Sequence, residues 1–295
     1  LYAALMNLWW ERLQASADEK ARLMERLADA MDGMSKGSTF RILPVTDMPF
    51  MDMPEIGGIY KEFVTRLLED EPWDELDIRA RVEQIAVPAM HLGGWYDIFV
   101  RATLTDFALM QKRGATVSAR RGQKVMIGPW LHGPLSGVVG EFDFGVRASD
   151  AFVIYNEVLL RWFDHWLKGV ENGIAEEPPV RIFVMGRNEW RSEQEWPLAR
   201  TVYTPCYLHS VGRANSLAGD GTLSWREPGM ESVDTFVYDP LHPVPTRGGN
   251  LCCSQAALPG GPFDQREVEG RQDVLVYTSE PLQEDLEVTG PVMVK

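Results

Sequence analysis

Residues 84–170 constrain the fold most strongly, because short apolar runs alternate there with helical patterns. Ala86 to Leu92 and Lys124 to Ile127 have strand length, and a glycine-containing loop follows each of them. Ile98 to Gln111, between them, has apolar residues at helical spacing, and Ser149 can cap a further helix that ends before a glycine. Strands that alternate with helices predict a mostly parallel sheet covered by helices, which is the α/β class.

The region before residue 84 has a helical pattern. Ser16 and Glu19 have the spacing of a capping box, and an apolar stripe follows them. Gly33 is placed to end this helix, and a second helix is expected over Tyr60 to Leu68.

The region beyond residue 178 changes character, because short strand patterns separated by turns replace the helical ones. Many strands without helices predict a β-sandwich. The expected strands are Val180–Met185, Val202–Leu208, Thr235–Tyr238, Val274–Tyr277 and Leu286–Val288.

Composition limits the class of protein. The 295 residues are 45% hydrophobic and 10% aromatic, which excludes a disordered or fibrous chain and predicts two or three domains. Lys and Arg number 29 against 43 Asp and Glu, and the net charge of −14 repels phosphate backbones. No window approaches the roughly 18 apolar residues of a transmembrane helix. We therefore expect neither nucleic acid nor a membrane as a partner.

The cysteines and the two ends of the chain give weaker indications. The three cysteines have no Cys-x-x-Cys spacing, so no zinc site is indicated, and Cys252 and Cys253 are expected to be free thiols rather than a redox pair. The chain opens at Leu1 within a helical pattern and ends at Lys295 within a strand pattern, so we expect it to be a fragment. Localisation is left open, and so is the oligomeric state, with a homo-oligomer as one option.

Two loops in the α/β stretch carry the residues best suited to catalysis. Asp97 follows the first strand and His132 follows the second. Parallel sheets place their sites at the carboxyl ends of the strands, so these side chains can meet there. A carboxylate fixes the tautomer of a neighbouring histidine and stabilises its charged form, and acid before histidine is the order of α/β-hydrolases. The alternative is that Asp97 caps the next helix and His132 is an ordinary loop residue.

The segment from Val87 to Gly133 resembles the CocE/NonD hydrolases. The resemblance is carried by Gly-Gly-Trp-Tyr-Asp at 93–97 and Gly-Pro-Trp-Leu-His at 128–132. The family contains esterases and acylases, and the X-Pro dipeptidyl-peptidases are its relatives. Residues 180–190 are similar to the start of that family's jelly-roll domain, and residues 243–250 are similar to a later part of it.

The resemblance implies an α/β-hydrolase core with a helical cap, followed by a jelly-roll β-sandwich. On this basis residues 1–83 form a helical cap region and residues 84–172 the C-terminal half of the catalytic domain. Residues 173–295 form a truncated jelly roll.

The resemblance also implies the roles of individual residues. Asp97 is the acid and His132 the base of a Ser-His-Asp triad, which needs no cofactor and no metal. Phe99 is expected to face the acyl pocket. Trp95 and Trp130 flank the triad residues, and they either line a substrate pocket or pack the loops.

The nucleophile is not evident in the sequence. One Gly-x-Ser-x-Gly string occurs, at residues 33–37, with Ser35 at its centre. A nucleophile elbow needs a buried strand before the serine and a helix after it, whereas here a helical pattern precedes Ser35 and Pro44 follows. The family places its serine before the cap helices. We therefore expect the serine and the oxyanion hole upstream of Leu1, and we expect the fragment to be inactive alone.

Three functions remain open from the sequence. The first is a serine hydrolase that cleaves an ester or amide bond in a small molecule or short peptide. The second is X-Pro dipeptidyl-peptidase activity, which needs an acidic group to bind the free amine of the substrate. The third is a non-catalytic jelly-roll binding protein, which would have no need of the paired acid and histidine loops.

Overall fold

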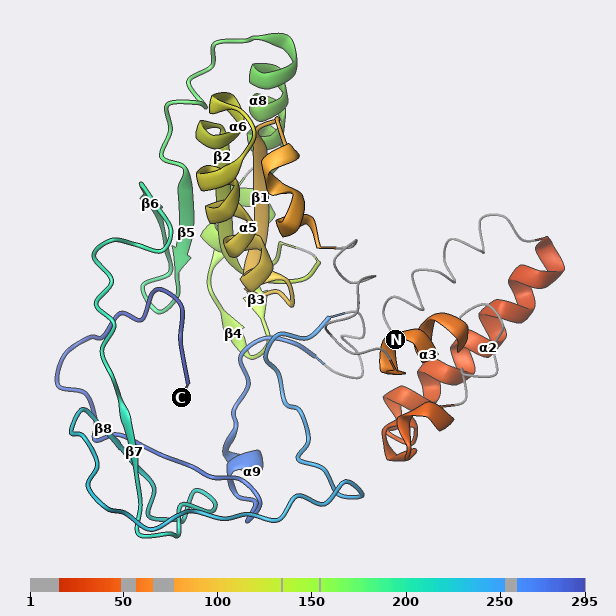
Figure 1. Cartoon of the computed structure of the whole chain (residues 1–295), viewed down its shortest axis with the longest axis vertical. Helices are drawn as coiled ribbons and strands as arrows, with labels where there is room; N and C mark the ends of the chain where they lie inside the picture. The colour runs from red at the N-terminus through yellow and green to blue at the C-terminus, as the bar shows by residue number, and fades with distance from the viewer. Residues whose placement is uncertain are drawn as a thin grey trace. The chain divides into compact units, whose positions relative to one another are not determined.

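The chain divides into two compact units, residues Leu1–Ile78 and Arg79–Lys295, in the computed structural model (Figure 1). The structure describes residues 16–48, 57–65, 77–133, 135–153, 155–252 and 259–294. Among the described residues, no helix is long and apolar enough to cross a membrane.

The first unit is helical where it is described. Its elements are α2 (Ala17–Ser35), η1 (Thr39–Arg41), η2 (Val45–Asp47) and α3 (Gly57–Thr65). The predicted capping box is present, because Ser16 N donates to Glu19 Oε2 at 3.1 Å and Glu19 N donates to Ser16 Oγ at 3.4 Å. The helix expected over Tyr60–Leu68 is α3, which begins three residues earlier than predicted. Its predicted last three residues lie outside the described ones.

The prediction that Gly33 ends the first helix is wrong. Helix α2 continues to Ser35, and Gly37, with φ of +74°, is the residue in the left-handed region. Gly33 is small for another reason, since a Cβ there would lie 2.6 Å from Thr39 Oγ1. The chain therefore turns back closely against α2 at this glycine, and Ser38 Oγ donates to Gly33 O at 3.0 Å.

The second unit contains a four-stranded sheet of order β1-β2-β5-β6 (Figure 1). β1 (Ala89–Tyr96), β2 (Gln123–Leu131) and β5 (Val180–Val184) are parallel, and β6 (Glu189–Glu193) is antiparallel to β5. The mostly parallel sheet predicted from the alternating pattern is confirmed.

Helices lie on both faces of this sheet, and they are α5 (Val100–Arg113), α6 (Val117–Arg121), α7 (Asp150–Val153) and α8 (Tyr155–Lys168). Val125 and Ile127 of β2 face the layer that contains Phe107 of α5. Met126, between them, faces the other layer and packs with Val153 of α7. Because both faces are covered, β2 is buried from its first residue through Trp130.

The long helix expected after Ser149 is present as α7 and α8, and the one residue between them lies outside the described part of the chain. Ser149 precedes the helix and contacts its first turn through its backbone carbonyl, not through its side chain. Its carbonyl accepts from Val153 N at 3.0 Å, whereas its hydroxyl donates to Val146 O at 2.7 Å. Gly169, with φ of +71°, follows the last residue of α8 as predicted.

The pairs Gly93-Gly94 and Gly128-Pro129, expected in the loops after the first two strands, lie inside the strands instead. β1 continues through Gly93-Gly94, and β2 continues through Gly128-Pro129. A Cβ on Gly94 would lie 2.0 Å from Trp130 O, and a Cβ on Gly128 would lie 2.4 Å from the Trp130 ring. These glycines allow the backbones and one indole to approach closely, so they do not interrupt the strands.

The first strand expected in the sandwich joins the α/β sheet. β5 pairs with β2 in parallel, and Ile182 of β5 belongs to the same buried cluster as Ile127. The structure therefore continues the sheet beyond residue 173, and the position of the boundary between the two domains stays a prediction.

The remaining elements of the second unit are short, namely η4 (Ile78–Gln84), β3 (Val138–Val139), β4 (Phe142–Asp143), η5 (Val146–Ala148), β7 (Tyr207–His209), β8 (Thr222–Ser224) and α9 (Arg266–Glu269). β7 overlaps the strand expected over Val202–Leu208. Within Val274–Tyr277, Leu275 forms an isolated bridge with Asn215, and Val274 O and Val276 N each make one backbone hydrogen bond. Thr235–Tyr238 and Leu286–Val288 are not strands, because no ladder partner lies beside them in the described residues.

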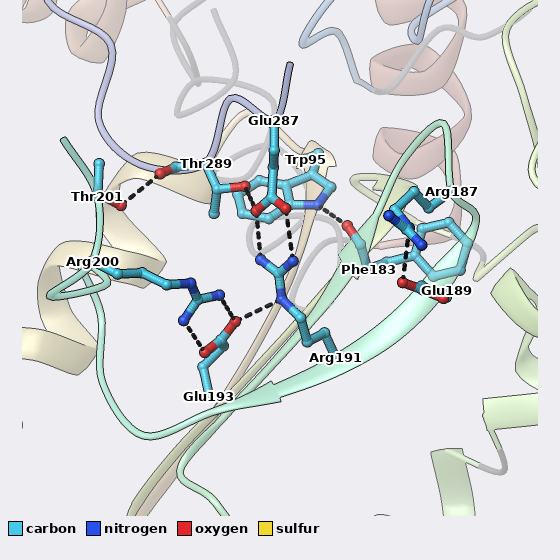
Figure 2. Close-up of polar contacts among 10 residues, drawn as sticks. All are labelled: Trp95, Phe183, Arg187, Glu189, Arg191, Glu193, Arg200, Thr201, Glu287 and Thr289. Atoms are coloured by element: carbon cyan, nitrogen blue, oxygen red, sulfur yellow. Dashed lines mark hydrogen bonds and ion pairs between the residues drawn. The ribbon is translucent and has the colours of Figure 1, made fainter. Parts of the chain in front are cut away.

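An ion-pair network joins β6 to the C-terminal segment (Figure 2). Arg191 of β6 donates to both carboxylate oxygens of Glu287, at 2.8 and 2.6 Å, and it also lies 2.6 Å from Glu193. These hydrogen bonds hold the pKa of Glu287 at about 2. Arg200 donates to both carboxylate oxygens of Glu193. Thr201 Oγ1 donates to Thr289 O, in the C-terminal segment that contains Glu287, at 3.0 Å. The network holds the segment against the edge strand of the sheet.

Candidate active site

The structure brings Asp97 and His132 together at the carboxyl ends of β1 and β2. Asp97 follows Tyr96, the last residue of β1, and His132 follows Leu131, the last residue of β2. Tyr96 and Leu131 are paired across the two strands. His132 Nδ1 consequently lies 3.3 Å from Asp97 Oδ2. The acid and the histidine thus lie side by side because they follow two neighbouring parallel strands, as the sequence predicted.

Asp97 is held by the backbone as well as by the histidine. Its residue is 7% exposed, and its Oδ1 accepts a hydrogen bond from Phe99 N at 2.8 Å. Its own backbone N donates to Gly94 O at 2.9 Å, and its carbonyl accepts from Val100 N at 3.2 Å. One carboxylate oxygen therefore fixes the turn before α5, while the other contacts His132. The N-cap of α5 is Phe99, so Asp97 supports the turn before the helix and does not cap the helix itself.

The ring of His132 is anchored on one side and accessible on the other. Its side chain is 38% exposed, and its centroid lies 5.1 Å from that of Phe99 in an edge-to-face contact. Among the described residues, the hydrogen bond to Asp97 is the only one made by the ring. An ionised carboxylate only accepts, so in a neutral ring this hydrogen bond places the proton on Nδ1 and leaves the lone pair of Nε2 free. This is the form of histidine that can take a proton from a nucleophile.

The three residues expected to contact substrate lie in different surroundings. Phe99 is 44% exposed and lies against His132. Trp95 donates from Nε1 to Phe183 O at 2.8 Å (Figure 2). Its ring also packs against that of Trp196. Trp130 is 1% exposed and donates to Ala148 O at 2.6 Å. This geometry supports the packing alternative for both tryptophans and leaves Phe99 beside the acid–histidine pair.

The serine of the Gly-x-Ser-x-Gly string is not in a nucleophile elbow. Ser35 is the last residue of α2, so a helix rather than a strand precedes it. It also belongs to the first compact unit, whereas Asp97 and His132 belong to the second. In the part of the chain that the structure describes, no serine hydroxyl contacts His132.

A second serine–histidine–acid contact, which the sequence analysis missed, lies in the C-terminal region. His209 Nε2 lies 2.9 Å from Ser224 Oγ, and His209 Nδ1 lies 2.7 Å from Glu231 Oε1. The pairing of β7 with β8 brings His209 and Ser224 together, and Glu231 approaches the ring from the segment after β8. The hydrogen bond from His209 lowers the pKa of Glu231. Ser224 Oγ also accepts from Arg226 N at 3.1 Å, so each polar atom of the cluster already has a partner.

The other histidine in the sheet is structural. His91 Nε2 lies 2.8 Å from Gln123 Oε1, and its ring meets Phe107 edge to face at 5.7 Å. Burial lowers the pKa of His91. This residue is therefore a neutral, satisfied part of the core.

In the part of the chain that the structure describes, no group of three His, Cys, Asp or Glu could hold a metal ion. Cys206 is free and exposed. Cys252 is disulfide-bonded, so the expectation of a free thiol is wrong at that position, and Cys253 lies outside the described residues.

Two family models match successive parts of the chain. Residues 4–134 match the X-Pro dipeptidyl-peptidase (S15 family), which covers the acid and histidine loops. Residues 172–295 match the X-Pro dipeptidyl-peptidase C-terminal non-catalytic domain. The two matches have the same order as the core and the C-terminal domain expected from the sequence.

Individual relatives agree with these models. The chain is 37% identical to the cocaine esterase of Rhodococcus sp. (strain MB1 Bresler) over 248 residues, which cover 83% of this chain and 42% of that protein. An α-amino acid ester hydrolase structure superposes with a TM-score of 0.60 at 26% identity, covering 79% of this chain and 38% of the other. An aminopeptidase from a marine sediment Thaumarchaeota archaeon has the same fold, with a TM-score of 0.60 at 24% identity over 79% of this chain and 37% of its own.

The chain therefore spans less than half the length of these relatives. Within that span the predicted fold class is confirmed, with part of an α/β-hydrolase followed by the C-terminal domain of the same group. Because sequence, family models and fold all agree, the chain belongs to the CocE/NonD hydrolases, the serine hydrolase family related to the X-Pro dipeptidyl-peptidases.

Proposed function

We propose that this chain supplies the acid and the base of a Ser-His-Asp triad that cleaves an ester or amide bond. The observation that carries the proposal is the 3.3 Å contact between His132 Nδ1 and Asp97 Oδ2 at the carboxyl ends of two parallel strands. This contact leaves the other ring nitrogen of His132 available to a serine hydroxyl.

The reaction follows from that arrangement. His132 Nε2 takes the proton of the serine as its oxygen attacks the carbonyl carbon, and then returns the proton to the leaving alcohol or amine. Water hydrolyses the acyl-enzyme by the same proton transfers in reverse order. Asp97 stays ionised, holds the ring in one tautomer and stabilises its charged form. The exposed ring of Phe99, which touches His132, forms part of the wall for the acyl group.

The nucleophile in this proposal is a serine that precedes Leu1. The position of Ser35 at the end of a helix argues against it, and the chain spans only 42% of the cocaine esterase that it matches. The oxyanion hole is assigned to the same upstream region. No cofactor or metal takes part in the proposed chemistry.

X-Pro dipeptidyl-peptidase activity is the second candidate, because both matching family models bear that description. An esterase is placed first because the 37% identical relative is named for ester cleavage. The two candidates share the same triad and differ in the acidic group that would bind the free amine of a peptide.

The two candidates are separated by substrate panels. The protein expressed from its complete reading frame is assayed with p-nitrophenyl acyl esters and with Ala-Pro-p-nitroanilide, as wild type and as His132→Ala. We expect ester hydrolysis that falls about 10⁴-fold or more in the variant. Activity on the anilide alone would assign the peptidase. No hydrolysis of either substrate class would overturn the proposal and favour a binding protein.

A further inference from the structure

We propose that Asn250, in the C-terminal domain, is a positioning residue for the triad acid. Its side-chain Nδ2 donates to Asp97 O at 2.8 Å and to Trp95 O at 3.2 Å. One amide group thus holds the two carbonyls on either side of Tyr96, where β1 leaves the sheet. The inference rests on the triad roles proposed for Asp97 and His132.

The backbone at this point needs support because the pairing of the two strands is irregular. Gly94 pairs with Gly128, but Tyr96 pairs with Leu131, so the register shifts across Trp95. The direction in which the Asp97 side chain leaves the backbone depends on how this irregular stretch is held. The Asp97–His132 contact of 3.3 Å is already slightly longer than most hydrogen bonds, so a small displacement is enough to lose it.

Asn250 itself is fixed by a tight backbone contact. Gly249 and Gly261 exchange two hydrogen bonds, at 2.7 and 2.9 Å. Gly248 and Gly249 have φ of +71° and +83°, in the left-handed region, and a Cβ on Gly248 would lie 2.3 Å from Gly261 O. The chain therefore reaches Asn250 through a turn that tolerates little displacement.

The segment around Gly260 and Gly261 also contacts the end of β2, which leads into His132. A Cβ on Gly260 would lie 2.7 Å from Leu131 Cδ2, and Leu131 is the residue before His132. Glu141 N donates to Pro262 O at 3.0 Å and binds the segment to the loop after β3. The C-terminal domain thus contacts the backbone next to both Asp97 and His132. Asn250 makes the polar part of this contact, through its hydrogen bond to the backbone carbonyl of Asp97.

The chemistry of the amide predicts a ranking of variants. Asn250→Ala removes both hydrogen bonds. Asn250→Asp keeps the shape but turns a carboxylate oxygen toward two carbonyl oxygens, so it is the more damaging change. Asn250→Gln keeps the donor on a side chain one methylene longer and restores part of the function.

Asn215 provides a matched control within the same domain. Its Nδ2 also donates to two backbone carbonyls, Thr235 O at 2.8 Å and Gln272 O at 2.9 Å. Asn215→Ala therefore removes the same number and type of hydrogen bonds without touching the Asp97 loop.

The kinetic test uses the protein expressed from its complete reading frame. We expect Asn250→Ala to lower kcat for an acyl ester about 10- to 100-fold with little change in KM, because misplaced catalytic groups slow chemistry more than binding. We expect Asn215→Ala to keep wild-type kcat, even if both variants lower the thermal midpoint equally. Equal kcat for the two alanine variants would overturn the proposal.

A second readout does not depend on activity. Long-range nitrogen–carbon-bound-proton NMR of histidine-labelled protein reports which nitrogen of His132 carries the proton. We expect the Nδ1-protonated tautomer in the wild type and in Asn215→Ala, and a loss of that preference in Asn250→Ala. If the wild type shows this tautomer and Asn250→Ala loses it, but the wild type hydrolyses no substrate, the proposed function fails while the positioning by Asn250 stands. An unchanged His132 tautomer in Asn250→Ala and Asn250→Asp would contradict the positioning role whatever the activity.

Discussion

Three histidines among the described residues contact a carboxylate, and two of them, His132 and His209, differ in what surrounds the second ring nitrogen. His132 meets Asp97 at 3.3 Å, its side chain is 38% exposed, and Nε2 has no partner among the described residues. His209 meets Glu231 at 2.7 Å and Ser224 at 2.9 Å, and its side chain is 11% exposed. The better hydrogen-bonded cluster is the one in which both ring nitrogens already have a partner, so close triad-like distances do not by themselves indicate a catalytic site.

The surroundings explain the difference. His132 follows a buried parallel strand, and such strand ends are where open α/β sheets form their sites. His209 lies on a short antiparallel hairpin, where cross-strand neighbours satisfy one another. The comparison therefore predicts that changes at the first pair act on catalysis, whereas changes at the second cluster act on stability.

The largest contrast is expected between the two histidines. His132→Ala should lower kcat/KM for an acyl ester by about 10⁴-fold or more, because the general base of the triad is lost. His209→Gln should leave kcat/KM within about 2-fold of wild type, since the hydrogen bonds of its ring go to Ser224 and Glu231 and not to the acid–histidine pair. Steady-state kinetics on the two purified variants measure this directly. A large loss of kcat/KM in a folded His209→Gln protein would break the comparison.

The two acids should repeat the contrast with a slightly smaller effect. Asp97→Asn should lower kcat by about 10³- to 10⁴-fold with little change in KM, because an amide favours the wrong tautomer of the imidazole. Glu231→Gln is the matched change at the second cluster and should keep kcat. Retained kcat in Asp97→Asn would remove Asp97 from the triad.

The serine of the second cluster should affect stability alone. Ser224→Ala removes the contact with His209 and the bond from Arg226 N, so we expect a thermal midpoint lower by about 1–3 °C. Its kcat should equal that of the wild type. Calorimetry together with an ester assay checks both statements, and a loss of turnover at unchanged midpoint would give Ser224 a catalytic role.

The smallest effect is a pH dependence of stability. The hydrogen bond from His209 lowers the folded-state pKa of Glu231 below its usual 4.5, so its contribution to stability is present above pH 4.5 and disappears as the pH falls through the lowered value. Thermal midpoints of wild type and Glu231→Gln should therefore differ at pH 6 and converge on acidification. A difference that stays constant down to pH 2 would contradict this assignment.

The sequence predicted the features that depend on order along the chain. The parallel sheet followed from the alternating pattern, and the meeting of Asp97 with His132 followed from their positions after two strands. It failed where distant segments approach one another. Gly94 and Gly128 resemble strand breakers, yet each is required by the position of Trp130.

The polar contacts missed by the sequence analysis are also long-range. Asn250 is 153 residues from Asp97, and no local pattern relates the two. The His209 cluster depends on a hairpin register that places a residue 15 positions away beside the ring. Apolar spacing predicted strands over Thr235–Tyr238, but a strand also needs a partner, and the described residues provide none.

Covalent labelling of the nucleophile tests the central assignment most directly. The protein expressed from its complete reading frame is treated with a fluorophosphonate, as wild type and as His132→Ala, and the adduct is located by peptide mass mapping. We predict one modified serine, N-terminal to Leu1, whose labelling slows at least about 10³-fold in His132→Ala. A modified Ser35 or Ser224, or labelling that is independent of His132, would contradict the account.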